Sequence, residues 1–194
     1  MPLILRKQDP PAYRNYKRYK PFLRLDCQNR CSYCHIPELR YGPPRNYTVD
    51  HFRPKSHPRF RKLICAYSNL FYVCQDCNSA KHAVWPKPQL ERLGFRFLDP
   101  CLDEFGDHWT IERDGTIHPL SNAGEYMAAM VQLNRPYLRS WRREKEELLR
   151  QIREMTRLDT QTLGTRQNPP IRRVLASLER RMTSEFGDFW QVVR

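Results

Sequence analysis

Two cysteine pairs have the spacing of a zinc knuckle: Cys31 with Cys34, and Cys74 with Cys77. A gap of two residues lets both thiolates of a pair bind one ion at about 2.3 Å, and two such pairs complete a tetrahedron. Because four protein sulfurs leave no position for water or substrate, the predicted zinc ion is structural. A redox-active CxxC motif is the alternative, but it predicts a thioredoxin-like βαβ context that the surrounding sequence lacks.

Three further cysteines, Cys27, Cys65 and Cys101, lie outside these pairs. Cys27 is near enough to Cys31 in the sequence to replace it as a zinc ligand. We interpret all three as ordinary buried thiols, because a reducing cytoplasm, the expected location, disfavours disulfides.

Three short motifs lie between and after the cysteine pairs. They are Asp50-His51-x-x-Pro54, Ser68-Asn69-Leu70 and Asn78-x-x-Lys81. In this order, the motifs and the cysteine pairs closely resemble the zinc-containing HNH endonucleases. The resemblance covers roughly residues 27–85. It implies the ββα-metal fold, in which two antiparallel strands, a loop and a helix hold one metal ion, and it implies cleavage of phosphodiester bonds.

Hydrolysis of a phosphodiester needs a base for the attacking water and a cation that spreads charge on phosphorus and on the leaving oxygen. His51 suits the base, because a neutral imidazole accepts a proton near pH 7. Asp50 points to the opposite side of the same strand and offers a hard oxygen ligand to Mg²⁺ or Mn²⁺. The amide oxygen of Asn78, which directly follows a zinc cysteine, is the expected second ligand.

The resemblance implies roles for three more residues. Asn69 is the middle asparagine of the motif, which holds the loop across from the base and keeps the imidazole oriented. Lys81 is expected to contact the scissile or a neighbouring phosphate. His82 follows Asn78 by four residues and becomes a further cation ligand if the helix continues that far. An exposed helical histidine is the alternative for His82.

The charge of the chain predicts a polyanionic partner. There are 34 basic and 21 acidic residues, a formal net charge of +13, and nucleic acid is the usual partner of such a protein. Residues 1–62 hold 15 basic and 4 acidic residues, so the excess is greatest there. Arg53 and Lys55, beside the expected base, are predicted phosphate contacts. The Arg-, Lys- and Tyr-rich residues 1–21 form either a nucleic-acid-binding arm or a strap packed on the domain.

The elements that must position these residues predict an α+β fold, in which the resemblance implies a small ββα-metal core. Residues 47–49 favour a short strand that leads into Asp50. Residues 108–118 indicate a hairpin around Asp114-Gly115, a pair that type I′ turns favour. We expect three regions: a basic arm over residues 1–21, a nuclease core with the zinc site and the hairpin over 22–120, and a helical region over 121–194.

The helical region has two apolar stripes. Ser121 is the expected N-cap of its first helix. Gly164 and Asn168 are expected to separate two longer helices, whose stripes have the spacing of core contacts. These stripes are Trp141, Leu148, Ile152 and Met155 on the first long helix, and Ile171, Val174, Leu175, Leu178 and Met182 on the second.

Together, these observations predict a metal-dependent DNA endonuclease, with RNA as the alternative substrate. A non-catalytic, zinc-ribbon-like nucleic-acid-binding module also fits the cysteines and the charge, but it leaves Asp50-His51, Asn69 and Asn78 unexplained. A looser likeness to stand-alone bacterial HNH proteins of Septu-type and retron-linked systems predicts an anti-phage role, with an ATPase subunit docked on the C-terminal helices. No apolar run approaches the roughly 20 residues of a membrane span, so we expect a cytoplasmic protein without a membrane partner.

Overall fold

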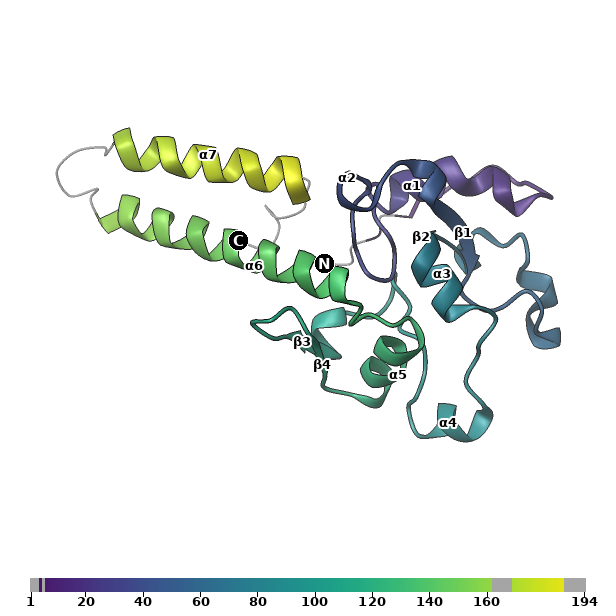
Figure 1. The fold of residues 1–194 in the computed structure, drawn as a ribbon. Coiled ribbons are helices and arrows are strands. Elements are labelled where there is room, and N and C mark those ends of the chain that lie inside the picture. Colours follow the sequence, from purple (N-terminus) through teal and green to yellow (C-terminus); the bar gives the residue numbers. More distant parts are fainter. Residues whose placement is uncertain (1–3, 5, 162–168, 187–194) are drawn as a thin grey trace.

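The structure is a computed structural model that describes residue 4, residues 6–161 and residues 169–186. Two two-stranded antiparallel sheets lie among helices, and a pair of long helices, α6 and α7, extends away from them (Figure 1). Within the described residues, no helix combines the length and the apolar character needed to cross a membrane. The α-helices are α1 (Lys20–Asp26), α2 (Glu38–Tyr41), α3 (Gln75–Lys81), α4 (Pro88–Arg92), α5 (Asn122–Met130), α6 (Pro136–Gln161) and α7 (Pro169–Phe186). The strands are β1 (Tyr47–His51), β2 (Leu70–Cys74), β3 (Trp109–Ile111) and β4 (Ile117–Pro119).

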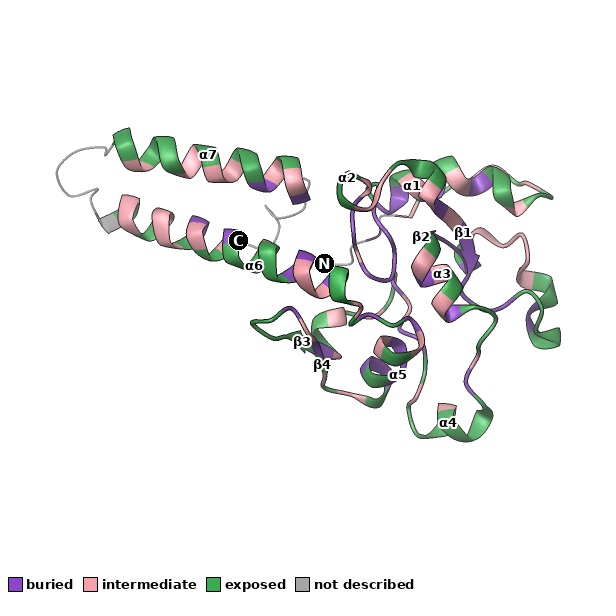
Figure 2. Cartoon of the chain, in the orientation of Figure 1, coloured by how far each residue is buried: buried purple, intermediate pink, exposed green. Residues whose placement is uncertain are grey.

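The first sheet pairs β1 with β2, and α3 follows β2 directly. In its register, Tyr47 lies opposite Cys74 and His51 lies opposite Leu70. All five residues of β2 are buried, which explains why that strand is a continuous apolar run instead of an alternating one. Figure 2 shows these strands in the buried interior, whereas the outward faces of α6 and α7 are exposed. The end of β1 therefore carries Asp50 and His51 on a rigid, buried element.

The second sheet is the hairpin of β3 and β4, which confirms the expected hairpin but not its turn. A type I′ turn needs a positive φ at both central residues, and among the described residues only Gly115 of the pair has one, at +83°. A side chain at Gly115 would also collide with α6, since its Cβ would lie 2.0 Å from the Arg139 carbonyl oxygen. Packing against α6 thus sets the shape of this turn. Asp114 instead accepts a hydrogen bond from the Thr116 amide at 2.8 Å.

The C-terminal helices pair their apolar stripes with each other. Ser121 caps α5 as expected, because its Oγ accepts a hydrogen bond from the Gly124 amide at 3.1 Å. Leu148 and Ile152 of α6 are buried, and so is Met182 of α7. Val174 departs from the predicted stripe and is 48% exposed. The expected break at Gly164 and Asn168 lies outside the described residues.

The described part of the N-terminal segment packs on the domain as a strap. Tyr19 is buried, and its ring lies against that of Tyr67 with centroids 5.2 Å apart. Its hydroxyl accepts a hydrogen bond from the Tyr13 amide at 2.9 Å. Exposed cations, including Arg14 and Arg18, remain on the outside of the strap.

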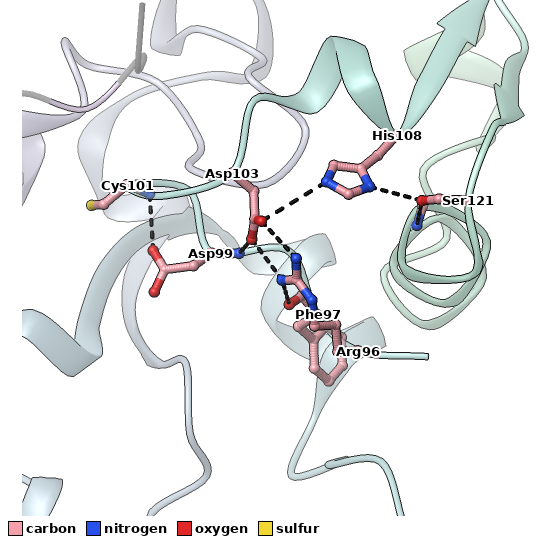
Figure 3. Close-up of polar contacts among 8 residues, drawn as sticks. Arg96, Phe97, Asp99, Cys101, Asp103, His108 and Ser121 are labelled. Atoms are coloured by element: carbon pink, nitrogen blue, oxygen red, sulfur yellow. Dashed lines mark hydrogen bonds and ion pairs between the residues drawn. The ribbon is translucent and has the colours of Figure 1, made fainter. Parts of the chain in front are cut away.

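A polar network fastens the segment before β3 to the start of α5 (Figure 3). Asp103 accepts two hydrogen bonds from Arg96, at 2.7 and 2.6 Å, and one from the Asp99 amide at 2.7 Å. His108 Nε2 lies 3.8 Å from Asp103, and His108 Nδ1 lies 2.7 Å from Ser121 Oγ. Because Ser121 Oγ also caps α5, we assign this Asp-His-Ser series a structural role.

Candidate active site

The four knuckle cysteines meet in one buried cluster. The sulfurs of Cys31, Cys34, Cys74 and Cys77 all lie within 4.8 Å of one another. Cys34 Sγ is 3.8 Å from Cys74 Sγ, and a tetrahedron with metal–sulfur distances of about 2.3 Å has edges of about 3.8 Å. The donor set therefore fits a structural zinc ion, as predicted. Cys74 ends β2 and Cys77 lies in α3, so the cluster fixes the start of that helix.

The other cysteines stay outside this cluster. Cys27 hydrogen-bonds with Ser32 Oγ at 3.1 Å, and burial raises the pKa of its thiol to about 11. Cys27 is therefore a protonated thiol at neutral pH, as expected. Cys65 and Cys101 differ from the prediction, because both are only partly buried.

An arginine of the helical region contacts the four-cysteine cluster. Arg135 Nη2 donates a hydrogen bond to Cys77 Sγ at 3.0 Å. Four thiolates around a divalent ion carry a net charge of −2, so this guanidinium stabilises the cluster. Sequence spacing gave no sign of this contact, since Arg135 lies 58 residues beyond Cys77.

We predict that Arg135→Met weakens zinc binding by about tenfold, because partners of metal ligands typically contribute 10–100-fold in affinity. Competition with a chromogenic chelator measures this loss. Arg143→Met removes an exposed arginine of α6 instead and should leave zinc affinity unchanged. Equal affinities for the two variants would contradict the role of Arg135.

A cleft of about 500 Å³ lies beside the end of β1 and gathers most of the predicted catalytic residues. Residues from β1, from α3 and its C-cap, from the loop after β1 and from the strap line it. The expected residues among them are Asp50, His51, Lys55, Asn78 and His82. Tyr16, which our site prediction did not include, lines the same cleft.

His51 is held in the orientation that a base requires. Its Nε2 lies 3.0 Å from the Ile64 carbonyl oxygen, and a carbonyl only accepts, so Nε2 carries the proton and Nδ1 keeps a lone pair. Burial lowers the pKa of His51 below its ordinary value, so the imidazole is neutral at pH 7. The Tyr16 ring packs edge-on against it, with centroids 4.5 Å apart.

Asn69 stabilises the segment whose Ile64 carbonyl contacts His51. The Asn69 side chain is buried; it accepts a hydrogen bond from the Arg53 amide at 2.9 Å and donates to the Arg53 carbonyl at 3.1 Å. It also donates to the Leu63 carbonyl at 3.3 Å, next to Ile64. Asn69 thus joins the loop after β1 to the segment that orients His51.

Asp50 and Asn78 offer oxygen ligands in the same cleft. Asp50 Oδ2 accepts hydrogen bonds from the Tyr33 hydroxyl at 2.6 Å and from Lys81 Nζ at 2.9 Å. No described residue donates to Asp50 Oδ1, and none bonds the Asn78 side chain. One carboxylate oxygen and one amide oxygen, with water completing the shell, fit Mg²⁺ or Mn²⁺.

Lys81 was expected to contact a phosphate, but it does not line the cleft. Its side chain has no exposed surface, and its ammonium bridges Asp50 to the His51 carbonyl oxygen at 2.9 Å. The reason is tertiary: an acidic residue buried at the end of β1 needs a compensating cation. Of the other predicted phosphate contacts, Lys55 lines the cleft, whereas Arg53 is exposed outside its lining.

We predict that Lys81→Met lowers the free energy of unfolding by about 3–5 kcal/mol, because it leaves the buried Asp50 carboxylate without its cation. Urea unfolding with excess zinc measures this. Lys87→Met, at an exposed lysine, is the matched control and should cost little. A loss below about 1 kcal/mol for Lys81→Met, typical of a surface pair, would contradict the assignment.

His82 lines the cleft, but it does so as the C-cap of α3 and not from within the helix. The helix ends at Lys81, and His82 caps it with a positive φ of +48°. The condition that the helix continues past Asn78 to His82 is therefore not met. His82 is exposed but still lines the cleft with Asn78.

Residues 31–83 match the family model described as HNH endonuclease. This range runs from the first zinc cysteine to just past His82, and it contains all the predicted catalytic residues. At the level of the family, the match supports nuclease chemistry on nucleic acid. Tyr16 and Arg135 lie outside the matched range. The comparisons with curated proteins and with solved structures found no match.

Proposed function

We propose that this protein is a metal-dependent endonuclease that hydrolyses phosphodiester bonds in DNA, with β1, β2 and α3 as a ββα-metal core. The observation that carries the proposal is the shared cleft: His51, whose Nε2 is held by the Ile64 carbonyl, lines the same space as Asp50 and Asn78. A zinc-binding module without catalysis would not require that arrangement.

His51 accepts the proton of the attacking water at Nδ1. The Ile64 carbonyl keeps Nε2 protonated and the ring fixed, so the lone pair has one direction. On taking up the proton the ring becomes a cation, which the hydrogen bond to Ile64 and the nearby charge of Asp50 stabilise. General-base catalysis of this kind contributes about 10²–10⁴ in rate.

Asp50 and Asn78 are the residues that would hold the divalent cation, and His82 is a further candidate ligand. When bound, such a cation supplies charge stabilisation to the phosphate and to the leaving oxygen. Lys81 already offsets one charge on Asp50, so the protein site alone binds cations weakly. The DNA phosphate must therefore supply part of the anionic shell, as is common for Mg²⁺.

The cleft has a basic border on which a DNA backbone can lie. Lys55 lines it and hydrogen-bonds to the Tyr16 hydroxyl at 3.1 Å. Arg53, two residues before Lys55, and the strap cations Arg14 and Arg18, each two residues from Tyr16, are exposed and belong to the chain's most basic segment. Contacts to phosphate make binding strongly dependent on salt.

Incubation with supercoiled plasmid and Mg²⁺ or Mn²⁺ tests the proposal. We expect open-circle or linear DNA, and no cleavage in EDTA. A parallel incubation with single-stranded RNA distinguishes the two substrates. Binding of duplex DNA without cleavage under either metal would favour the zinc-ribbon-like module instead.

The anti-phage role and its ATPase partner stay predictions from the looser resemblance. The surfaces on which that partner was expected to dock are the two C-terminal helices, and their apolar stripes pack against each other. A docked subunit would therefore have to use the exposed outer faces of α6 and α7 (Figure 2).

A further inference from the structure

A second cavity, of about 100 Å³, is lined by residues from the start of α6, from the β3–β4 hairpin and from the first zinc knuckle. It is separate from the cleft that holds His51, because no residue lines both. Its wall combines apolar and aromatic groups with a few polar ones. The residues that matter here are His35, Trp109, Ile111, Ile117, Trp141 and Lys145.

Two polar atoms in the wall residues have no partner. Trp141 is only 6% exposed, and its indole Nε1 is buried without a hydrogen bond to any described residue. The same holds for His35 Nε2. A buried donor without an acceptor costs about 1–3 kcal/mol, so folding alone does not account for placing two such atoms at one small cavity.

A cation in the wall also lacks an ion-pair partner at contact distance among the described residues. Lys145 is partly buried, and no carboxylate of the described residues lies within ion-pair distance of it. The lining carboxylate, Glu146, is exposed and pairs with Arg153 at 3.6 Å. Burial, and then the positive charge of Arg30, lower the pKa of Lys145, whereas the charge of Glu146 raises it.

Arg142 shows what a satisfied cation in this region looks like. It lines the same cavity, but Nε donates to the Gly115 carbonyl at 2.6 Å and Nη2 donates to the Leu133 carbonyl at 2.8 Å. Burial lowers the pKa of Arg142 to about 10, and the charge of Cys34 acts against that shift. Lys145 has no such hydrogen bond among the described residues.

We propose that this cavity binds a small organic anion that carries one carboxylate. The carboxylate would accept a hydrogen bond from Trp141 Nε1 and face the Lys145 ammonium, with His35 Nε2 as a second donor. A single ammonium matches a monoanion better than a doubly charged phosphate. The apolar side chains of Ile111 and Ile117 suit a short hydrocarbon body. The volume equals that of about three waters, which limits the ligand to a few carbon atoms.

Titration with butanoate, followed by ¹H–¹⁵N NMR of the indole groups, tests this proposal without reference to nuclease activity. Trp141→Phe assigns the Trp141 resonance. We expect that resonance to move saturably with butanoate, and to stay in place with butanamide, which has the same shape without the charge, and with inorganic phosphate. Lys145→Met should weaken butanoate binding at least tenfold, whereas Arg143→Met should not change it.

Three results would contradict the proposed anion site. A resonance that does not respond to butanoate would mean that water alone fills the cavity. Equal responses to butanoate and butanamide, or full binding by Lys145→Met, would show that the charge of Lys145 plays no part. If Lys145→Met also shifts resonances far from the cavity, Lys145→Gln replaces it as the variant to test.

Discussion

The His51→Ala variant is expected to cleave plasmid at least a hundredfold more slowly than the unmodified protein while keeping its zinc. Among the described residues that line the cleft, His51 alone has an imidazole ring that a backbone carbonyl holds in place. Removing a general base costs about 10²–10⁴ in rate. Initial rates of open-circle formation measure the loss, and zinc content by atomic emission shows that the scaffold is intact.

His118→Ala is the matched control for this variant. His118 lies on β4 with its side chain 63% exposed and does not line the cleft, so its loss should leave the rate unchanged. If His51→Ala cuts at the unmodified rate, His51 is not the base. If both variants lose activity together with zinc, the effect is on folding.

Removal of zinc is expected to unfold the nuclease core. The four sulfurs join the first knuckle to the end of β2 and the start of α3, and the regular elements around them are short. Structural zinc sites contribute about 10–16 kcal/mol of binding free energy, which is folding free energy when the site does not exist in the unfolded chain. Thermal unfolding by circular dichroism, with and without a strong chelator, measures this.

Cysteine variants separate this effect from general thiol chemistry. Cys74→Ser should release zinc and reproduce the effect of the chelator, because Cys74 is fully buried in the cluster. Cys65→Ser should not, since Cys65 is partly exposed and hydrogen-bonds only to the Arg14 carbonyl. A cooperative transition that the chelator leaves in place would show that the core stands without the metal.

The sequence was sufficient for features that depend on local spacing. A gap of two residues lets both cysteines of a pair point to one site, and the four cysteines meet in one cluster as predicted. The cap at Ser121 depends only on its next three residues and was also correct. Asp50 and His51 both line the cleft at the end of β1, although neighbouring strand residues point to opposite faces, so the sequence alone did not guarantee that they share it.

Features that depend on tertiary packing were not predictable in this way. Lys81 is buried because Asp50 and the His51 carbonyl meet it from a strand 30 residues earlier. The turn at Gly115 follows from its contact with α6, and the strap places Tyr16 against His51 across 35 residues of sequence. The Tyr/Lys/Arg pattern of the strap was visible, but no periodicity indicated which ring would reach the base.

A structure of the protein soaked with Mn²⁺ and a short DNA duplex tests the central claim most directly. Anomalous scattering should locate zinc among the four sulfurs and manganese beside Asp50 Oδ1 and the Asn78 amide oxygen, with His51 Nδ1 facing the phosphate across from it. Manganese bound away from both oxygens, or a phosphate that lies out of reach of His51, would contradict the mechanism even if zinc were present.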